Sequence, residues 1–472
     1  MLQLGTEESA LLARMRREIG MRLAVNSMAE QYYDGSFTVK NLGIAVPPSL
    51  ADIGTVSDWP ATVVDIRHER MQFEGWLDGG RTNIHELEKS TNAGLKVSEA
   101  VLDSLVFGVG FLALEETGRQ GGEVRLYPCS PLSSTMLWDY TTDKALAGLR
   151  TVNTVDGERR EYLYLPGQIV TLDGDEVVDR RYFPNLDGAV PMVRLRNKLR
   201  SRRFTGQSEI TRAVMYYTDA AVRTLLGMEI NREFYTTPQR WALNADMSIF
   251  GFEDGMTTSE RLELGWRVQS GKMLAMPPPE PGDPAPVVGQ FSPAPPTPYI
   301  EQIRTYSQLL ASASGIPSAY LGFSTENPPS GDAIRAWTER LIRAVEGKQA
   351  IANPDLHLLG WMMHRMANGQ MDWSQWQGVE EKWRDAATPT KAADADAAVK
   401  LVGAGILPPE SSVTMDRVGL SPAQQRRIET ERRRQGLTDV ARAIRERQVE
   451  PVAEALSTRG MPAPEDDAGG EQ

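Results

Sequence analysis

The segment that decides the fold is GIPSAYLGFSTENPPSGDAIRAW, residues Gly315–Trp337. It lies between two of the longest helical patterns of the chain, one from Tyr299 to about Ser314 and one from about Ser330 to Met366. The Gly and Pro residues at its ends are typical of a loop. Helix-to-helix connections usually need only about 2 to 8 residues, whereas this connection has roughly fifteen. Its length therefore favours a function for the loop itself.

The residues that flank the loop indicate a sharp exit from one helix and a sharp entry into the next. Gly315 and Pro317 are typical of a helix end, and Ser330 is a predicted N-cap with Asp332 in the first helical turn. Further along, Pro354 cannot donate a helical hydrogen bond, so the sequence predicts a kink at this residue.

A third helix is predicted before the loop, from about Ser208 to Phe234. Between it and the helix at Tyr299, the sequence predicts short strands and loops, with ten of the chain's 30 prolines in Pro277–Pro298. The two helices that flank this segment each carry an apolar stripe, which we expect to be a packing surface. Its residues are Ile210, Val214, Tyr217, Ala221 and Leu225 in the first helix, and Ile303, Tyr306 and Leu310 in the second.

The remaining chain combines helices with a strand-rich region, so the predicted fold class is α+β. Glu7–Tyr33 has apolar residues at helical spacing. Between Phe111 and about Arg196, short alternating runs are separated by Gly, Asp and Pro about every ten residues, which is typical of an antiparallel β region. A last helical region begins at Thr388, and the terminal APEDDAGGEQ is predicted to be disordered.

The charge of the chain argues against tight binding of nucleic acid. Fifty-one Lys and Arg against 63 Asp and Glu give a net charge of −12, which is the wrong sign for strong phosphate binding. Solubility alone explains this charge, although a protein that lets DNA slide past would also benefit from weak contacts. The longest near-apolar run, LVFGVGFLAL, is too short to span a membrane, and the single cysteine, Cys129, excludes an internal disulfide.

One run of basic residues stands out against this acidic background. It is RLRNKLRSRR, with Arg194, Arg196, Lys198, Arg200, Arg202 and Arg203. Basic residues before a helix oppose its dipole, so a negative group is expected to face them. A neighbouring subunit, a DNA backbone and plain solvation all remain open as explanations.

The catalytic motifs that we looked for are absent or incomplete. GVGFLA at Gly108 has the spacing of a dinucleotide loop but is predicted to follow a helix, and GWRVQSGKM at Gly265 lacks the spacing and hydroxyl of a phosphate loop. His357 and His364 are two helical turns apart, too far to share one metal without other ligands. We therefore expect no catalysis, no cofactor and no metal.

Four segments together resemble the portal protein of tailed bacteriophages, in particular the type found in long-tailed phages of actinobacterial hosts. They are YYDG at Tyr32 with GIAVPP at Gly43, DWPATVVDIRHERMQFEGW at Asp58, GQSEITRAVMYYTDAAVRTLLGMEINREFYTTPQRWAL at Gly206, and the segment at Gly315. None is a catalytic signature; their order and spacing carry the resemblance, which covers most of the chain.

The resemblance implies a phage portal fold. Its expected parts are a wing over 1–205, a stem helix over 206–236, a clip over 237–297, a second stem helix over 298–315, a tunnel loop over 316–331, a kinked helix that returns to the wing over 332–387, a helical crown over 388–450 and a flexible tail over 451–472. The loop tip that would face DNA consists of Phe323, Ser324, Thr325, Glu326 and Asn327, which include one acid and no base.

The family also implies function and partners. A ring of twelve copies at the capsid vertex would be the channel for DNA packaging and ejection. Its expected partners are double-stranded DNA in transit, the terminase motor, head-to-tail connector proteins, and the major capsid and scaffolding proteins, with no membrane. It would be assembled in the host cytoplasm. Two alternatives remain open on the sequence alone: a scaffold or connector of another viral assembly, and an enzyme with a site built from scattered acids.

Overall fold

The computed structural model describes most of the chain. The described residues are 3–38, 57–79, 81–117, 122–201, 205–236, 240–245, 251, 253, 255–270, 284–292, 294–322, 330–369, 371, 373–387, 391–420, 424–425 and 427–435. The chain divides into two compact units, Met1–Ala387 and Thr388–Gln472. Each unit is described by itself.

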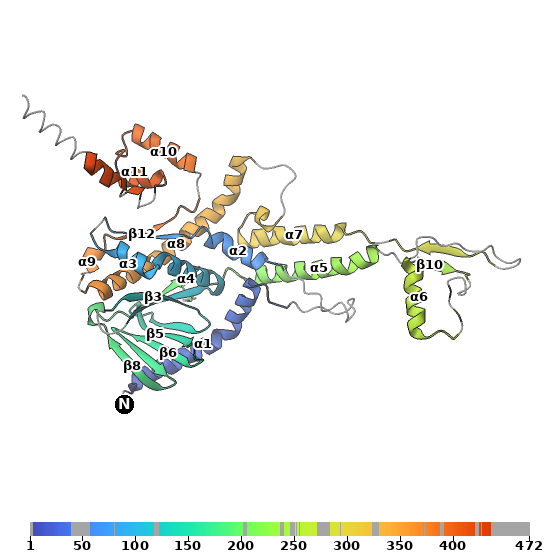
Figure 1. The fold of residues 1–472 in the computed structure, drawn as a ribbon, viewed down its shortest axis with the longest axis horizontal. Coiled ribbons are helices and arrows are strands. Elements are labelled where there is room, and N and C mark those ends of the chain that lie inside the picture. Colours follow the sequence, from blue (N-terminus) through green and yellow to red (C-terminus); the bar gives the residue numbers. More distant parts are fainter. Residues whose placement is uncertain are drawn as a thin grey trace, which may run out of the picture. The chain divides into compact units, whose positions relative to one another are not determined.

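The first unit begins with helices that surround a strand-rich region (Figure 1). The helices are α1 (Thr6–Tyr33), α2 (Trp59–His68), α3 (Ile84–Thr91) and α4 (Ala93–Phe107). The strands are β1 (Phe73–Leu77), β2 (Val109–Glu116), β3 (Val124–Cys129), β4 (Ser134–Asp139), β5 (Lys144–Asn153), β6 (Arg159–Leu165), β7 (Gln168–Asp173), β8 (Glu176–Tyr182) and β9 (Met192–Arg196). The predicted N-terminal helix and antiparallel β region are both present.

Strands β4 to β8 form a five-stranded antiparallel sheet in sequence order. Its inner face is apolar because alternate residues such as Leu163 and Leu165 of β6 lie on one side, next to Val170 and Leu172 of β7. Helix α1 covers this face through residues of its own apolar side, including Leu12. This sheet and α1 form a small core of their own.

The main core is built around β2, which lies between β3 and β9 in a three-stranded antiparallel sheet. Helix α4 is followed by Gly108, whose φ of 95° is readily adopted by glycine only, and the chain then turns directly into β2. A Cβ at Gly110 would lie 2.0 Å from the carbonyl oxygen of Ala100. Glycine at this position therefore allows α4 to pack closely on β2.

Helices α5 (Arg212–Thr236) and α7 (Thr297–Ser314) lie side by side (Figure 1). They approach closely where the ring of Tyr299 lies 3.3 Å from the position that a Cβ of Gly227 would occupy. One turn further along at the same end of the pair, the amide of Asn231 donates to the carbonyl of Ala294 at 2.9 Å.

A small module lies between these two helices in the chain. It contains β10 (Arg240–Leu243), α6 (Thr258–Ser270) and β11 (Val287–Gln290). The two strands pair antiparallel, and Trp241 covers Gly289, where a Cβ would lie 2.4 Å from the indole ring. The prediction of strands and loops alone was wrong here, because α6 is a helix. Glu260 caps it by accepting hydrogen bonds from the backbone and hydroxyl of Thr257, each at 2.8 Å.

Helix α8 (Gly331–Asn368) follows the described part of the Gly315 segment and contains Pro354 in its interior. Tryptophans from other elements hold the helix around this proline. The indole of Trp76 donates to the carbonyl of Leu356 at 3.1 Å, and that of Trp383 donates to the side chain of Asn353 at 2.7 Å. After α9 (Trp373–Trp376), strand β12 (Glu380–Trp383) pairs with β1, so the chain returns to the first helices and strands.

The described part of the second unit contains α10 (Lys391–Gly403) and α11 (Ser412–Arg417), which contact each other. Ser411 caps α11 by accepting a hydrogen bond from the backbone of Val413. Across the described portions of both units, no helix combines the length and apolar character needed to cross a membrane.

Candidate functional site

A buried cluster of charged side chains lies at the base of the paired helices, that is, where α5 begins and α7 ends. Its centre is Glu209, three residues before α5, with a side chain that is 1% exposed. Three cations surround its carboxylate: the Nζ of Lys348 from α8 at 2.5 Å, the Nζ of Lys198 at 2.8 Å, and the Nε of Arg67 from α2 at 3.4 Å. The cluster thus joins segments that are far apart in the sequence.

Asn197 completes the cluster and fixes its geometry. Its amide donates to Glu209 at 2.9 Å and to the carbonyl of Gln207 at 2.8 Å, while its own oxygen accepts a hydrogen bond from Lys348. The backbone of Asn197 also bonds to Gly108, at the turn between α4 and β2. The charges are therefore tied to the main core of the first unit.

The pKa values within the cluster follow from burial and from its excess of cations. Burial by itself raises the pKa of Glu209, but Lys348, Arg67 and Lys198 outweigh it and lower the pKa to about 2. Burial lowers the pKa of Lys348 to about 8, against the attraction of Glu209. Glu209 is therefore firmly ionised at neutral pH, and its one negative charge faces three cations.

Helix α2 extends this network to the segment that follows α7. The guanidinium of Arg67 donates to the carbonyl of Ser314, the last residue of α7, and to the carbonyl of Val63. One turn later, Arg70 donates to the hydroxyl of Tyr320 at 3.2 Å and to the carbonyl of Ala386 at 2.6 Å. The start of α5, the end of α7 and the middle of α8 are therefore joined through polar contacts, several of them buried.

The residues predicted as stem packing fall into two groups. Those that are buried are Ile210, Val214, Ala221 and Leu310, and those that are partly buried are Tyr217, Leu225, Ile303 and Tyr306. The sequence prediction missed Thr218, Val222 and Leu226 of α5, which are buried as well. The buried face of α5 in the single chain is thus rotated from the predicted stripe toward these residues.

The predicted tunnel-loop tip, Phe323, Ser324, Thr325, Glu326 and Asn327, lies outside the described residues. The segment that leads into it is described. Ile316 and Leu321 are buried, and Gly322 has a φ of 87°. The segment before the tip is therefore held by buried apolar side chains as well as by the hydrogen bond between Arg70 and Tyr320.

The basic run from Arg194 requires a correction, because several of its members are used within the chain. Arg194 is buried with its guanidinium 3.8 Å from the ring centre of Trp138, Arg196 lies 3.7 Å from Asp355 of α8, and Lys198 binds Glu209. Arg194 and Arg196 lie on the same face of strand β9 because they are two residues apart. Arg200 is exposed, and Arg202 and Arg203 lie outside the described residues.

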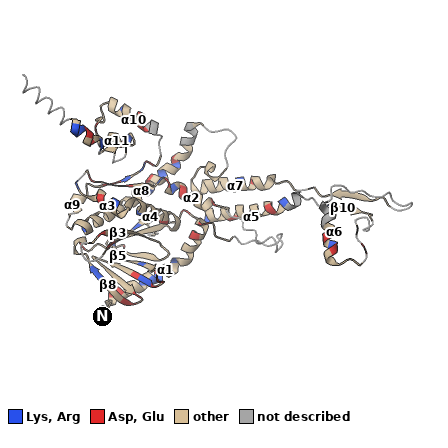
Figure 2. Cartoon of the chain, in the orientation of Figure 1, with Lys and Arg blue, Asp and Glu red and all other residues tan. Residues whose placement is uncertain are grey.

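Charges elsewhere on the paired helices are mixed. Figure 2 shows both signs along α5, where Asp219 and Glu229 alternate with Arg223 and Arg232. In the parts of the chain that are described, no group of three or more His, Cys, Asp or Glu residues could hold a metal ion.

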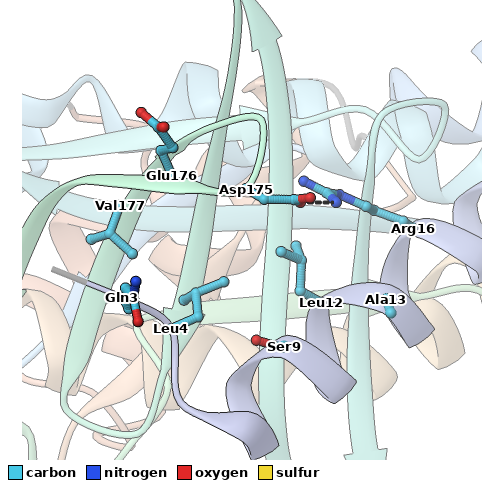
Figure 3. A pocket seen from close by; sticks show the side chains of 9 residues that line it. All are labelled: Gln3, Leu4, Ser9, Leu12, Ala13, Arg16, Asp175, Glu176 and Val177. Atoms are coloured by element: carbon cyan, nitrogen blue, oxygen red, sulfur yellow. Dashed lines mark hydrogen bonds and ion pairs between the residues drawn. The ribbon is translucent and has the colours of Figure 1, made fainter. Parts of the chain in front are cut away.

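A cavity of about 600 Å³ opens between the start of α1 and the β7–β8 turn (Figure 3). Its walls include Leu4, Leu12 and Val177. Its charged lining consists of Arg16, Asp175 and Glu176. Arg16 donates to Asp175 at 2.7 Å and also to Glu161 and the carbonyl of Gly174. The donors of this arginine are therefore occupied within the chain.

Comparison with known proteins shows that this chain is similar to phage portal proteins. The chain is 27% identical over 400 residues to the portal protein of Mycobacterium phage L5, which covers 80% of this chain and 79% of that protein. The portal protein of Mycobacterium phage D29 matches equally well, with 27% identity over 399 residues and the same coverage.

The family follows from a match to a protein-family description over most of the chain. Residues 82–436 match the family described as phage portal protein, SPP1 Gp6-like. The chain belongs to this family, and the portal function predicted from the sequence is confirmed: it is a portal protein at the vertex of a phage capsid, the channel for DNA packaging and ejection.

Chains from solved structures of gene transfer agent particles also match this chain. A chain from the neck of a native gene transfer agent particle computed with C12 symmetry has a TM-score of 0.43 and 15% identity, and the match covers 77% of this chain and 90% of that one. A chain from the virion of that kind of particle has a TM-score of 0.44 and 15% identity, with coverage of 84% and 99%.

Proposed function

We propose that twelve copies of this portal protein form a closed ring in which α5 and α7 are the stem helices beside the DNA channel. The observation that carries the proposal is the α5–α7 pair itself. Its base is fixed by the Glu209 cluster, and its two helices are joined in sequence by a small strand and helix module. Such a pair can transmit force between the two ends of a channel because neither helix can slide without breaking buried contacts.

The other parts of the portal are assigned around this pair. Residues 1–205 form the wing, 237–297 the clip, 316–331 the tunnel loop, 332–387 the helix that returns to the wing, and 388–450 the crown. The pairing of β12 with β1 supports the return to the wing, because it joins residues more than 300 positions apart in one small sheet.

Exposed apolar side chains support contacts between copies. On α5 and α7 they are Tyr216, Ile300 and Leu309, and in the proposed clip they are Leu243, Leu262, Val287, Val288 and Phe291. Large apolar groups gathered on one part of a surface typically mark an interface with another protein. We assign those on the helices to neighbouring subunits, and those on the clip to the terminase motor and the head-to-tail connector.

The charge of the chain supports weak contact with DNA in transit. A net charge of −12 and alternating signs along α5 oppose tight binding to phosphates. The protein then acts as a structural channel without catalysis, and the tunnel loop is the part that approaches DNA. Contacts with the major capsid and scaffolding proteins belong to the wing and crown.

Shortening the loop tests this assignment. Replacing Ser324–Asn327 with Gly-Gly should leave ring formation and incorporation into capsids unchanged, because the ring is held by stem and wing. The ratio of DNA-filled to empty capsids should fall sharply when this variant replaces the normal portal in infection.

Two substitutions of Glu326, at the same tip, test the effect of charge. Glu326→Lys should reduce filling mildly, since every copy adds an attractive contact to the phosphate backbone, whereas Glu326→Gln should reduce it less. Normal filling with the shortened loop would refute the tunnel role, and failure of that variant to form rings would show that the segment is a packing element.

A further inference from the structure

A second cavity, of about 330 Å³, lies between α1 and the strands β2, β4 and β9. Part of its lining is apolar and comes from Val109 and Phe111 of β2 and from Met136 and Leu137 of β4. Its charged lining is dominated by arginines, namely Arg14 and Arg22 of α1 and Arg194 of β9, with Glu18 as the carboxylate among them. The cavity has room for a small polar group and is rich in donors.

The arginine from β9 is unusual because it is buried with part of its hydrogen-bonding capacity unused. Arg194 is 4% exposed and stacks on Trp138. The guanidinium of Arg194 is hydrogen-bonded to the hydroxyl of Tyr140, which also lines the cavity. Its Nε has no hydrogen-bond partner. An unsatisfied donor of a buried charged group destabilises the fold.

Two further orphaned atoms lie on the residues next to it. The Nε of Arg196 and the Oδ2 of Asp355 are also buried without a hydrogen-bond partner in the described structure. Asp355 lies 3.7 Å from Arg196, and burial raises its pKa to about 6 although both arginines lower it. Arg196 and Asp355 pair with each other outside the cavity lining, so within the lining the unpartnered donor is the Nε of Arg194.

The charge of the cavity lining favours an anion. Three arginines, Arg14, Arg22 and Arg194, line the cavity together with one carboxylate, Glu18. Glu18 accepts a hydrogen bond from Thr135 at 3.3 Å. Within the described residues, neither Arg14 nor Arg22 has an ion-pair partner within 4.0 Å. The arginine of the first cavity, Arg16, differs in having its donors occupied by Asp175 and Glu161.

We propose that this cavity is a binding site for a single oxyanion, a phosphate or a carboxylate, held by Arg14, Arg22 and Arg194. Arginine is suited to both groups because its planar donors match their oxygens. The anion has two possible sources, a free ion such as inorganic phosphate or an acidic side chain of a second copy of the chain. The site itself is a property of the single chain and does not depend on the proposed ring.

The test uses the full-length purified chain, with inorganic phosphate as the probe and chloride at equal ionic strength as the reference. Thermal unfolding should shift upward with phosphate in a saturable way, and calorimetric titration should give one site per chain. The double variant Arg14→Gln/Arg22→Gln should bind phosphate about tenfold more weakly. Arg17→Gln, an exposed arginine of α1 outside the cavity lining, is the matched control and should bind like the parent.

Comparison of dilute single chains with assembled rings separates the two sources. If the anion is free, both forms bind phosphate and the double variant assembles normally. If a neighbouring acidic side chain fills the cavity in the ring, only the single chain binds phosphate and the double variant forms weaker rings. The proposal is overturned if single chains show no saturable effect of phosphate beyond that of chloride, or if the double variant binds phosphate as well as the parent.

Discussion

The Nζ atom of Lys348 lies 2.5 Å from Oε1 of Glu209, and the two side chains are only 6% and 1% exposed. The residues are 139 positions apart in the sequence. Their contact joins α8 to the start of α5 where Arg67 also reaches the end of α7. We infer that this contact anchors the paired helices α5 and α7 to the rest of the first unit.

Removing the central charge should strongly destabilise the first unit. Glu209→Gln would leave Lys348 and Arg67 buried without a counter-charge, so the free energy of unfolding should fall by about 3–5 kcal/mol. Urea unfolding measures this loss. Glu339→Gln is the control, because Glu339 forms an exposed pair with Arg343 on α8 and should cost less than about 0.5 kcal/mol. Equal effects of the two substitutions would contradict the structural role of the cluster.

The stabilisation that Glu209 provides should depend on pH. The pKa of Glu209 is about 2 in the folded protein and 4.5 ordinarily, so the unfolded chain binds more protons between these values. The stabilisation by Glu209 is therefore complete above pH 4.5 and is lost as the pH falls toward 2. The stability difference between parent and Glu209→Gln should shrink by about 1 kcal/mol between about pH 7 and pH 3.5. A difference that stays constant or grows on acidification would be inconsistent with this pKa.

Two neighbouring leucines of α7 separate folding from assembly. Leu310 is fully buried, so Leu310→Ala should lower the stability of the single chain by about 2–5 kcal/mol. Leu309 is 43% exposed, and Leu309→Ala should change that stability by less than about 0.5 kcal/mol. If α7 contacts a neighbouring copy, Leu309→Ala should nevertheless weaken rings in sedimentation. Rings as stable as those of the parent would remove Leu309 from the interface.

Two glycines should respond in opposite ways to the same substitution. Gly347 is exposed in α8 with open space around its missing Cβ, so Gly347→Ala should raise stability by about 0.5–1 kcal/mol. A Cβ at Gly110 would lie 2.0 Å from Ala100, so Gly110→Ala should lower stability by at least about 2 kcal/mol. Thermal unfolding distinguishes them, and a neutral effect at Gly110 would mean that α4 and β2 are less closely packed than described.

Most helices and strands could be predicted from the sequence because their signals are local. The apolar spacing of Glu7–Tyr33 and of Tyr299–Ser314 corresponds to α1 and α7, and the alternating runs before Arg196 correspond to β2–β9. Helix α6 was missed because the surrounding prolines dominated the pattern. Its signal was present in the Thr-x-x-Glu spacing from Thr257 to Glu260.

The charge cluster could not be predicted in this way. Glu209, Lys348 and Arg67 lie on three segments, and no spacing in the sequence relates them. The partners of the basic run could not be predicted for a related reason. A negative group was expected to face the run, but that Asp355 and Glu209 of the same chain face Arg196 and Lys198 depends on contacts between distant segments.

The central claim is that copies of this chain form a ring whose channel is bordered by α5 and α7. The most direct measurement is an electron cryo-microscopy reconstruction of the purified full-length protein. The account predicts closed rings with a central hole, with α5 and α7 beside the hole and Leu309 at a contact between copies. Rings with α5 and α7 on the outer rim, or single chains at concentrations where portals assemble, would contradict it.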